Sequence, residues 1–135
     1  MKTKYEKYLS LFLLFVAIHS ILVGIALIVV TNEVRILFGF LPSPEQFFQT
    51  QGGVFHIVMA IAYAMAAYDQ KKYATLIQFI IIVKFFASAF LFSYFIIESS
   101  NLLILLSGIG DLLMAVIILI LYKKSAKIVI DTGVK

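Results

Sequence analysis

Four ionisable side chains stand alone within long apolar stretches of the sequence: His19, His56, Lys84 and Asp111. A charged Lys or Asp at the centre of a membrane-spanning helix costs about 2.5–3.5 kcal/mol on insertion scales. An ion pair would remove much of this cost, so we predict that Lys84 and Asp111 pair. Ionisable groups inside membranes commonly bind ligands or carry protons, and we expect the four residues to form a site of that kind.

Tyr63 is a fifth candidate for this site, because it lies two helical turns from His56 on one helix face. Other roles stay open. The Lys84–Asp111 pair could simply fix helix register, and each histidine could be neutral and bonded to a neighbour. His19 and His56 also allow a bis-histidine haem. With Asp111 they allow a metal site, although we predict no metal.

Aromatic side chains crowd one apolar stretch and are interpreted first as packing and lipid-facing bulk. A flat apolar ligand such as a quinone could stack on some of them while its carbonyls bond to the polar residues. The aromatic residues are Phe79, Phe85, Phe86, Phe90, Phe92, Tyr94 and Phe95.

The elements that carry these residues are four apolar segments, at about 8–30, 51–68, 73–97 and 101–122. About 20 apolar residues are needed to cross a bilayer as a helix. The sequence is 63% hydrophobic and 13% charged, which is far more apolar than a soluble domain. We therefore predict one all-α domain, 1–124, a transmembrane four-helix bundle of up-down-up-down order, with a cytoplasmic tail at 125–135.

The four candidate residues share a depth in this arrangement. His19, Lys84 and Asp111 each lie about 16 Å from the expected cytoplasmic end of their segment, and His56 lies about 18 Å from it. The longest connection, 31–43, ends in a helix-start pattern in which Ser43 caps and Pro44 begins the second helix. We also interpret Gly52-Gly53 as helix packing rather than a phosphate loop.

The basic residues set the orientation. With four spans, nine lysines fall on one side, against Arg35 on the other, so both termini are predicted to be cytoplasmic. We expect a bacterial cytoplasmic membrane. The nine are Lys2, Lys4, Lys7, Lys71, Lys72, Lys123, Lys124, Lys127 and Lys135.

Several function classes lack support in the sequence. It has no Cys, which excludes disulfides and thiolate metal sites. No GxSxG, HExxH or Gly-rich phosphate loop marks an enzyme, and no basic folded face for nucleic acid is visible.

A short resemblance adds to this interpretation. The end of the second segment, 62–69, the mid-helix Lys84 and the Gly110-Asp111 pair resemble small bacterial four-helix membrane proteins of the DoxX-like group. The resemblance spans the last three segments. It implies a four-helix membrane fold and a hydrophobic ligand, since some members are thought to be membrane subunits of quinone-linked oxidoreductases. It transfers no catalytic residue.

We therefore favour a non-enzymatic membrane protein, an accessory or small-molecule-binding subunit with the polar site at mid-membrane. One alternative is a proton-coupled transporter acting as a homodimer, in which Asp111 exchanges protons and Lys84 tunes it. The other is a redox subunit that binds haem or quinone. The expected partners are the lipid bilayer, a second copy or a larger membrane complex, and an apolar small molecule, with no nucleic acid.

Overall fold

A computed structural model describes residues 3–132, with side chains described for 3–126, and this part of the chain is helical without strands. Four helices are long and apolar enough to cross a membrane, which confirms the all-α prediction and the four apolar segments. The helices are α1 (Lys4–Val29), α2 (Asn32–Leu37), α3 (Phe47–Tyr68), α4 (Ala74–Ile97) and α5 (Leu102–Thr132).

Local signals at the helix ends explain several of these bounds. Thr3 caps α1 in a capping box, in which its hydroxyl accepts from the Glu6 backbone N–H and the Glu6 carboxylate accepts from the Thr3 N–H. The Asn101 side chain accepts a hydrogen bond from the Leu103 N–H at the start of α5. The connection 98–101 is short, as the sequence predicted, so α4 and α5 are neighbours.

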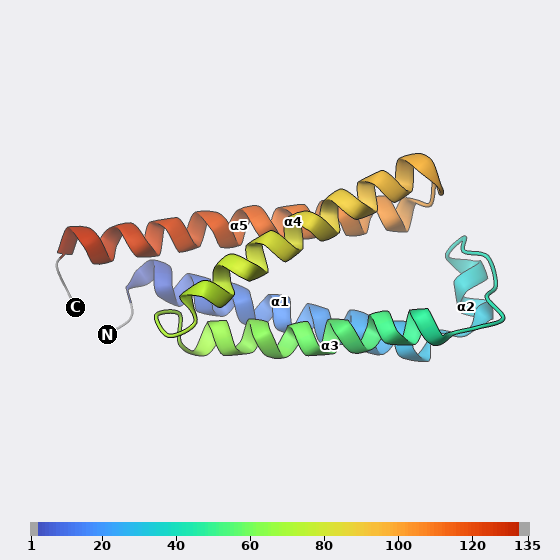
Figure 1. Ribbon diagram of the computed structural model, residues 1–135, viewed down its shortest axis with the longest axis horizontal. Helices are drawn as coiled ribbons and strands as arrows, with labels where there is room; N and C mark the ends of the chain where they lie inside the picture. Colours follow the sequence, from blue (N-terminus) through green and yellow to red (C-terminus); the bar gives the residue numbers. More distant parts are fainter. Residues whose placement is uncertain (1–2, 133–135) are drawn as a thin grey trace.

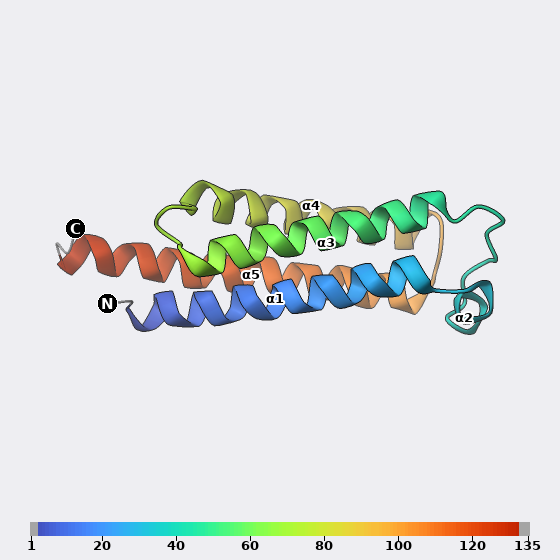
Figure 2. The same ribbon diagram turned by 90° about the horizontal axis from the view of Figure 1, so that it is seen from below.

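The long helices form two closely packed pairs, α1 with α3 and α4 with α5 (Figures 1 and 2). Contacts between the pairs are fewer: α1 packs against α5, and α3 touches α4 less extensively. The beginning of α1 and the end of α5 lie at one end of the molecule, here called the terminal end, and α2 lies at the other, the α2 end.

The pairing of α1 with α3 depends on two glycines. A Cβ atom on Gly24 would lie 2.7 Å from the Gly53 carbonyl oxygen, and one on Gly53 would lie 2.6 Å from the Gly24 carbonyl oxygen. Each side chain would therefore collide with backbone, so only glycine allows this close approach. Gly53 packs as the sequence indicated, whereas Gly52 faces open space.

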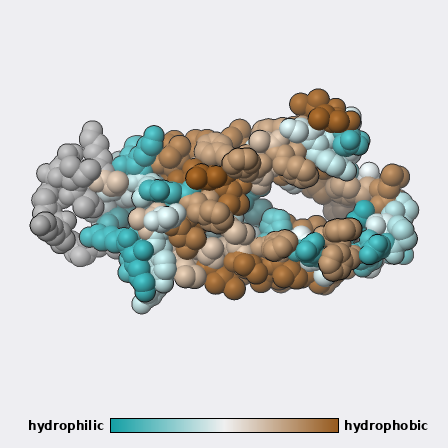
Figure 3. Space-filling view, viewed as in Figure 1, coloured by the Kyte–Doolittle hydropathy of each residue, from teal (hydrophilic) through white to brown (hydrophobic). Residues whose placement is uncertain are grey.

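The hydrophobic core occupies the half of the molecule nearer the terminal end. Leu9, Leu13, Ala66, Ile77 and Ile118 are among its fully buried residues. Toward the α2 end the two pairs separate, and Figure 3 shows an opening between them. The core residues on all four long helices are Leu9, Leu13, Val16, Ala17, Ala60, Tyr63, Ala66, Ala67, Ile77, Ile80, Ile81, Met114 and Ile118.

A polar contact ties the connection between α3 and α4 to α1 at the terminal end. The Gln70 side-chain amide donates to the Glu6 carbonyl oxygen at 2.6 Å and to the Ser10 hydroxyl at 2.9 Å. Ser10 in turn donates to the Ala67 carbonyl. These bonds complement the apolar core and fix the end of α3 and the connection that follows it to α1.

Two expectations about the connections are wrong. Helix α3 begins at Phe47, not near Pro44, because the Ser43 hydroxyl donates to the Glu45 carbonyl instead of capping. The 31–43 connection also contains α2, which the sequence analysis did not predict. In addition, α5 continues to Thr132, beyond the expected bound at 122, so much of the predicted tail is helical.

Candidate functional site

Lys84 and Asp111 meet where the core gives way to the opening. The Lys84 Nζ lies 2.5 Å from Asp111 Oδ1, and the two side chains are 5% and 14% exposed. Lys84 comes from α4 and Asp111 from α5, so the contact joins the two members of one helix pair. A buried charge pair of this kind is tolerated because each partner offsets the desolvation of the other.

One helical turn further toward the α2 end, a second contact sets the spacing of α4 and α5. The Ser88 hydroxyl donates to the Gly108 carbonyl oxygen at 2.8 Å. A Cβ on Gly108 would lie 3.0 Å from the Phe92 ring, so the small residue lets the helices approach. Ser88 is four residues from Lys84 and Gly108 three from Asp111, so this contact lies beside the ion pair and aligns it.

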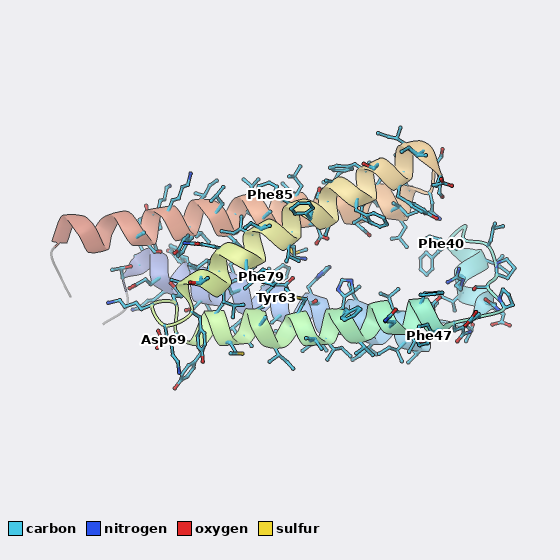
Figure 4. All side chains as sticks on the ribbon, in the orientation of Figure 1. Phe40, Phe47, Tyr63, Asp69, Phe79 and Phe85 are labelled. Carbon is cyan, nitrogen blue, oxygen red and sulfur yellow. The ribbon has the colours of Figure 1, made fainter. Side chains whose placement is uncertain are left out.

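Tyr63 joins this site from the other helix pair. Its ring is 2% exposed, and its centroid lies 5.7 Å from the Lys84 Nζ. Figure 4 shows Tyr63 on the side of α3 that faces α4. The negative face of the ring can stabilise the ammonium group, particularly where water is excluded. The site thus receives side chains from α3, α4 and α5.

The two histidines lie on the other helix pair, His19 on α1 and His56 on α3. The Ser20 hydroxyl donates to the His56 carbonyl oxygen at 2.9 Å and lies 3.3 Å from His56 Nδ1. The buried Nδ1 of His19 has no hydrogen-bond partner among the described residues.

The structure therefore brings the sequence candidates together in two groups. Lys84, Asp111 and Tyr63 are in direct proximity. Among the described residues, His19 and His56 form no hydrogen bond or ion pair with these three, and His56 instead bonds Ser20. In the described part of the chain, no three His, Asp or Glu side chains gather as a metal site would require, so the metal alternative at His19, His56 and Asp111 has no geometric support.

Two positioning residues were missed from the sequence. Neither Ser20 nor Ser88 was among the residues singled out from the sequence. Serine spaced one turn from an ionisable residue is a usable signal, because its hydroxyl can bond a neighbouring helix where water is scarce. Ser88 lies one helical turn after Lys84 and is 2% exposed.

In three comparisons with known proteins, the chain matched no family model, no curated protein and no solved structure. The function is therefore argued from the geometry of the site. The apolar helices with a buried charged cluster are consistent with an integral membrane protein.

Proposed function

We propose that this chain is an integral membrane protein, a non-enzymatic accessory or binding subunit that holds a small amphiphilic molecule between its two helix pairs. The observation that carries the proposal is the buried Lys84–Asp111 pair, which lies beside Tyr63 at the edge of the hydrophobic core, on the side toward which the helix pairs separate. Polar groups at the base of an apolar space are the usual composition of a ligand site.

The unpaired ring nitrogen of His19 supports binding over a purely structural role. A buried polar atom that lacks a hydrogen bond costs about 1–3 kcal/mol. His19 Nδ1 is such an atom in the described structure. A ligand head group with hydrogen-bonding atoms would recover this cost, and its apolar body would occupy the opening.

The membrane arrangement that we propose has up-down-up-down spans with both termini in the cytoplasm of a bacterial cell. Basic residues support this orientation. Among the described side chains, Lys4, Lys7, Lys71 and Lys124 stand near the terminal end, whereas Arg35 stands at the α2 end. The DoxX-like resemblance agrees with a four-helix membrane protein that takes a hydrophobic ligand, and it remains a proposal.

The packing of the helices favours one second candidate, a proton-coupled carrier acting as a homodimer. Each helix pair is closely packed within itself, whereas contacts between the pairs are fewer. Two such bodies could rock about the site between them. Asp111 would exchange the proton, and Lys84 would adjust the proton affinity of Asp111. Proton-driven flux into liposomes that persists in Asp111→Asn would exclude this mechanism.

Native mass spectrometry in mild detergent tests the binding function. We expect the wild-type protein to retain a discrete apolar molecule at a fixed ratio. The double variant Lys84→Met/Asp111→Leu removes both charges together, and we expect it to stay folded and to lose at least about tenfold in retention, which corresponds to about 1.4 kcal/mol.

The matched control is Ser107→Ala on the exposed face of α5, where the hydroxyl bonds only the Leu103 carbonyl of its own helix. It should retain the molecule like the wild type. Binding at this site is refuted if the wild type carries no discrete ligand, or if the double variant retains it as well as the control does.

A further inference from the structure

We infer that the ligand of this site enters sideways from the lipid, between α3 and α4, while the segment 30–46 caps the path from water at the α2 end. The inference rests on the proposed binding function and narrows the ligand to a lipid-borne amphiphile with a hydrogen-bonding head and a flexible apolar chain. Three features of the structure carry it: the separation of α3 from α4, the folded cap, and the contact that joins the cap to α5.

The sideways opening lies where α3 and α4 diverge. Figure 1 shows α4 moving away from α3 toward the α2 end, and Figure 3 shows the opening on this face. Between Phe47 and Met59 of α3, Gly53 alone is buried, and no residue of α4 from Ala89 to Ile97 is buried. In a bilayer this half of the boundary between α3 and α4 would face acyl chains.

The cap is a folded unit, not a loose connection. The Asn32 side chain accepts from the Ser43 N–H at 3.0 Å and donates to the Ser43 carbonyl oxygen at 3.3 Å, which closes the segment on itself. The Arg35 guanidinium donates twice to the Leu41 carbonyl, at 3.2 and 3.0 Å, and also bonds Gln49 of α3. The bond to Gln49 fixes the cap to the α1–α3 pair.

The cap reaches the other helix pair through one hydrogen bond. The Asn101 side-chain amide donates to the Phe38 carbonyl oxygen at 2.8 Å. Gly39 follows with φ +78°, a conformation that suits glycine, and a Cβ there would lie 3.3 Å from the Asn101 amide nitrogen. At the α2 end, no other hydrogen bond between the described residues joins the cap to α4 or α5.

Apolar and polar side chains together line the junction of the cap with α5. A groove of about 740 Å³ lies there, lined by Leu37, Leu103 and Leu106 and also by the polar residues Ser99, Ser100 and Asn101. Figure 4 shows Phe40 pointing from the cap back toward the space between the helix pairs. Leu37, Leu103, Leu106 and the Phe40 ring offer a polar solute no hydrogen bond, which disfavours its passage beyond the polar residues of this groove.

The distance from the site to the cap sets the length of the ligand's apolar chain. Asp111 lies about 14 Å along α5 from Leu102, at 1.5 Å per residue. If the head group of the ligand binds at the Lys84–Asp111 pair, its apolar chain extends into the opening toward the α2 end, next to the lipid between α3 and α4.

Nitroxide collision measurements in bilayers test the route directly. Because the chain has no Cys, one introduced cysteine carries the label. Ile104→Cys reports on the inner face of α5, where Ile104 is 8% exposed, and Ile109→Cys is the matched control on its outer face, where Ile109 is 40% exposed. Dissolved oxygen concentrates in lipid, and a neutral nickel chelate stays in water.

We expect the label at position 104 to meet oxygen much more than nickel, as the label at position 109 does. Asn101→Ala should release the cap and raise nickel collisions at position 104 at least about threefold, with no change at 109. Met59→Cys on α3, which packs against the core, gives a second reporter if the label at position 104 disturbs folding, and circular dichroism checks each variant.

The inference is overturned if nickel reaches the label at position 104 of the capped protein more readily than the label at 109, or if Asn101→Ala leaves both reporters unchanged. The native mass spectrum separates this failure from that of the binding function. A retained ligand with a water-open site would refute the lipid route alone. A protein without any retained ligand would refute the binding function, and the inference would fall with it.

Discussion

At the residue scale, Lys84 and Asp111 are buried together, and each makes the burial of the other tolerable. The two side chains are 5% and 14% exposed and their charged atoms lie 2.5 Å apart. Removing one partner leaves an unpaired charge in an apolar place, whereas removing both leaves side chains that can pack. Single substitutions of this pair should therefore destabilise the protein more than the double substitution does, which is not expected for an ordinary polar contact.

We expect Lys84→Met alone and Asp111→Leu alone each to lower the free energy of unfolding by about 3–5 kcal/mol. The double variant should lie within about 1 kcal/mol of the wild type, because no charge remains unpaired. Reversible unfolding in mixed micelles measures the free energy of unfolding of the wild type, the two single variants and the double variant. Losses that simply add in the double variant would contradict direct pairing.

Individual site residues could be predicted from the sequence where their type is unusual for an apolar helix. Lys84 and Asp111 were identified because charged residues rarely stand inside apolar helices. Ser20 and Ser88 are ordinary in such helices, so their bonds to neighbouring carbonyls required coordinates. Whether His19 and His56 bind a ligand stays a prediction.

At the element scale, the α1–α3 pair is held by the approach of Gly24 and Gly53. The backbones come so close that a Cβ on either residue would meet the carbonyl oxygen of the other. Backbone cannot move aside as a flexible side chain can, so added volume there must separate the helices. This pair also carries the cap, so its spacing affects the whole α2 end.

We expect Gly53→Ala to lower the free energy of unfolding by about 1–3 kcal/mol, the usual cost of overpacking. Gly52→Ala is the matched control. Its Cβ meets no atom within 4 Å, and alanine is the better helix former by about 1 kcal/mol. Thermal unfolding of both variants measures the difference, and equal stabilities would refute the close contact.

The connections were harder to predict than the long helices. Four apolar segments of sufficient length marked α1, α3, α4 and α5. The Ser43-Pro44 pattern indicated a helix start, but Asn32, eleven residues earlier, bonds Ser43 on both its N–H and its carbonyl. Such a distant contact overrides a local signal, and sequence spacing gives no sign of it.

At the scale of the whole molecule, two helix pairs meet at the terminal end and separate at the α2 end. This shape places the charged cluster at the boundary between a closed core and an opening. The proposed function requires that the axis of the molecule lies across a bilayer, so that the opening faces lipid and the basic residues at the terminal end face the cytoplasm.

The topology of the chain in intact cells tests this account most directly. A membrane-impermeant maleimide should label Glu45→Cys and Ser100→Cys in intact bacteria, and Lys71→Cys and Lys124→Cys only after the cells are broken. These four residues are exposed and lie in or near the connections and helix ends. If Lys71→Cys and Ser100→Cys were labelled from the same side, the four-span arrangement, and with it the shared site, would be contradicted.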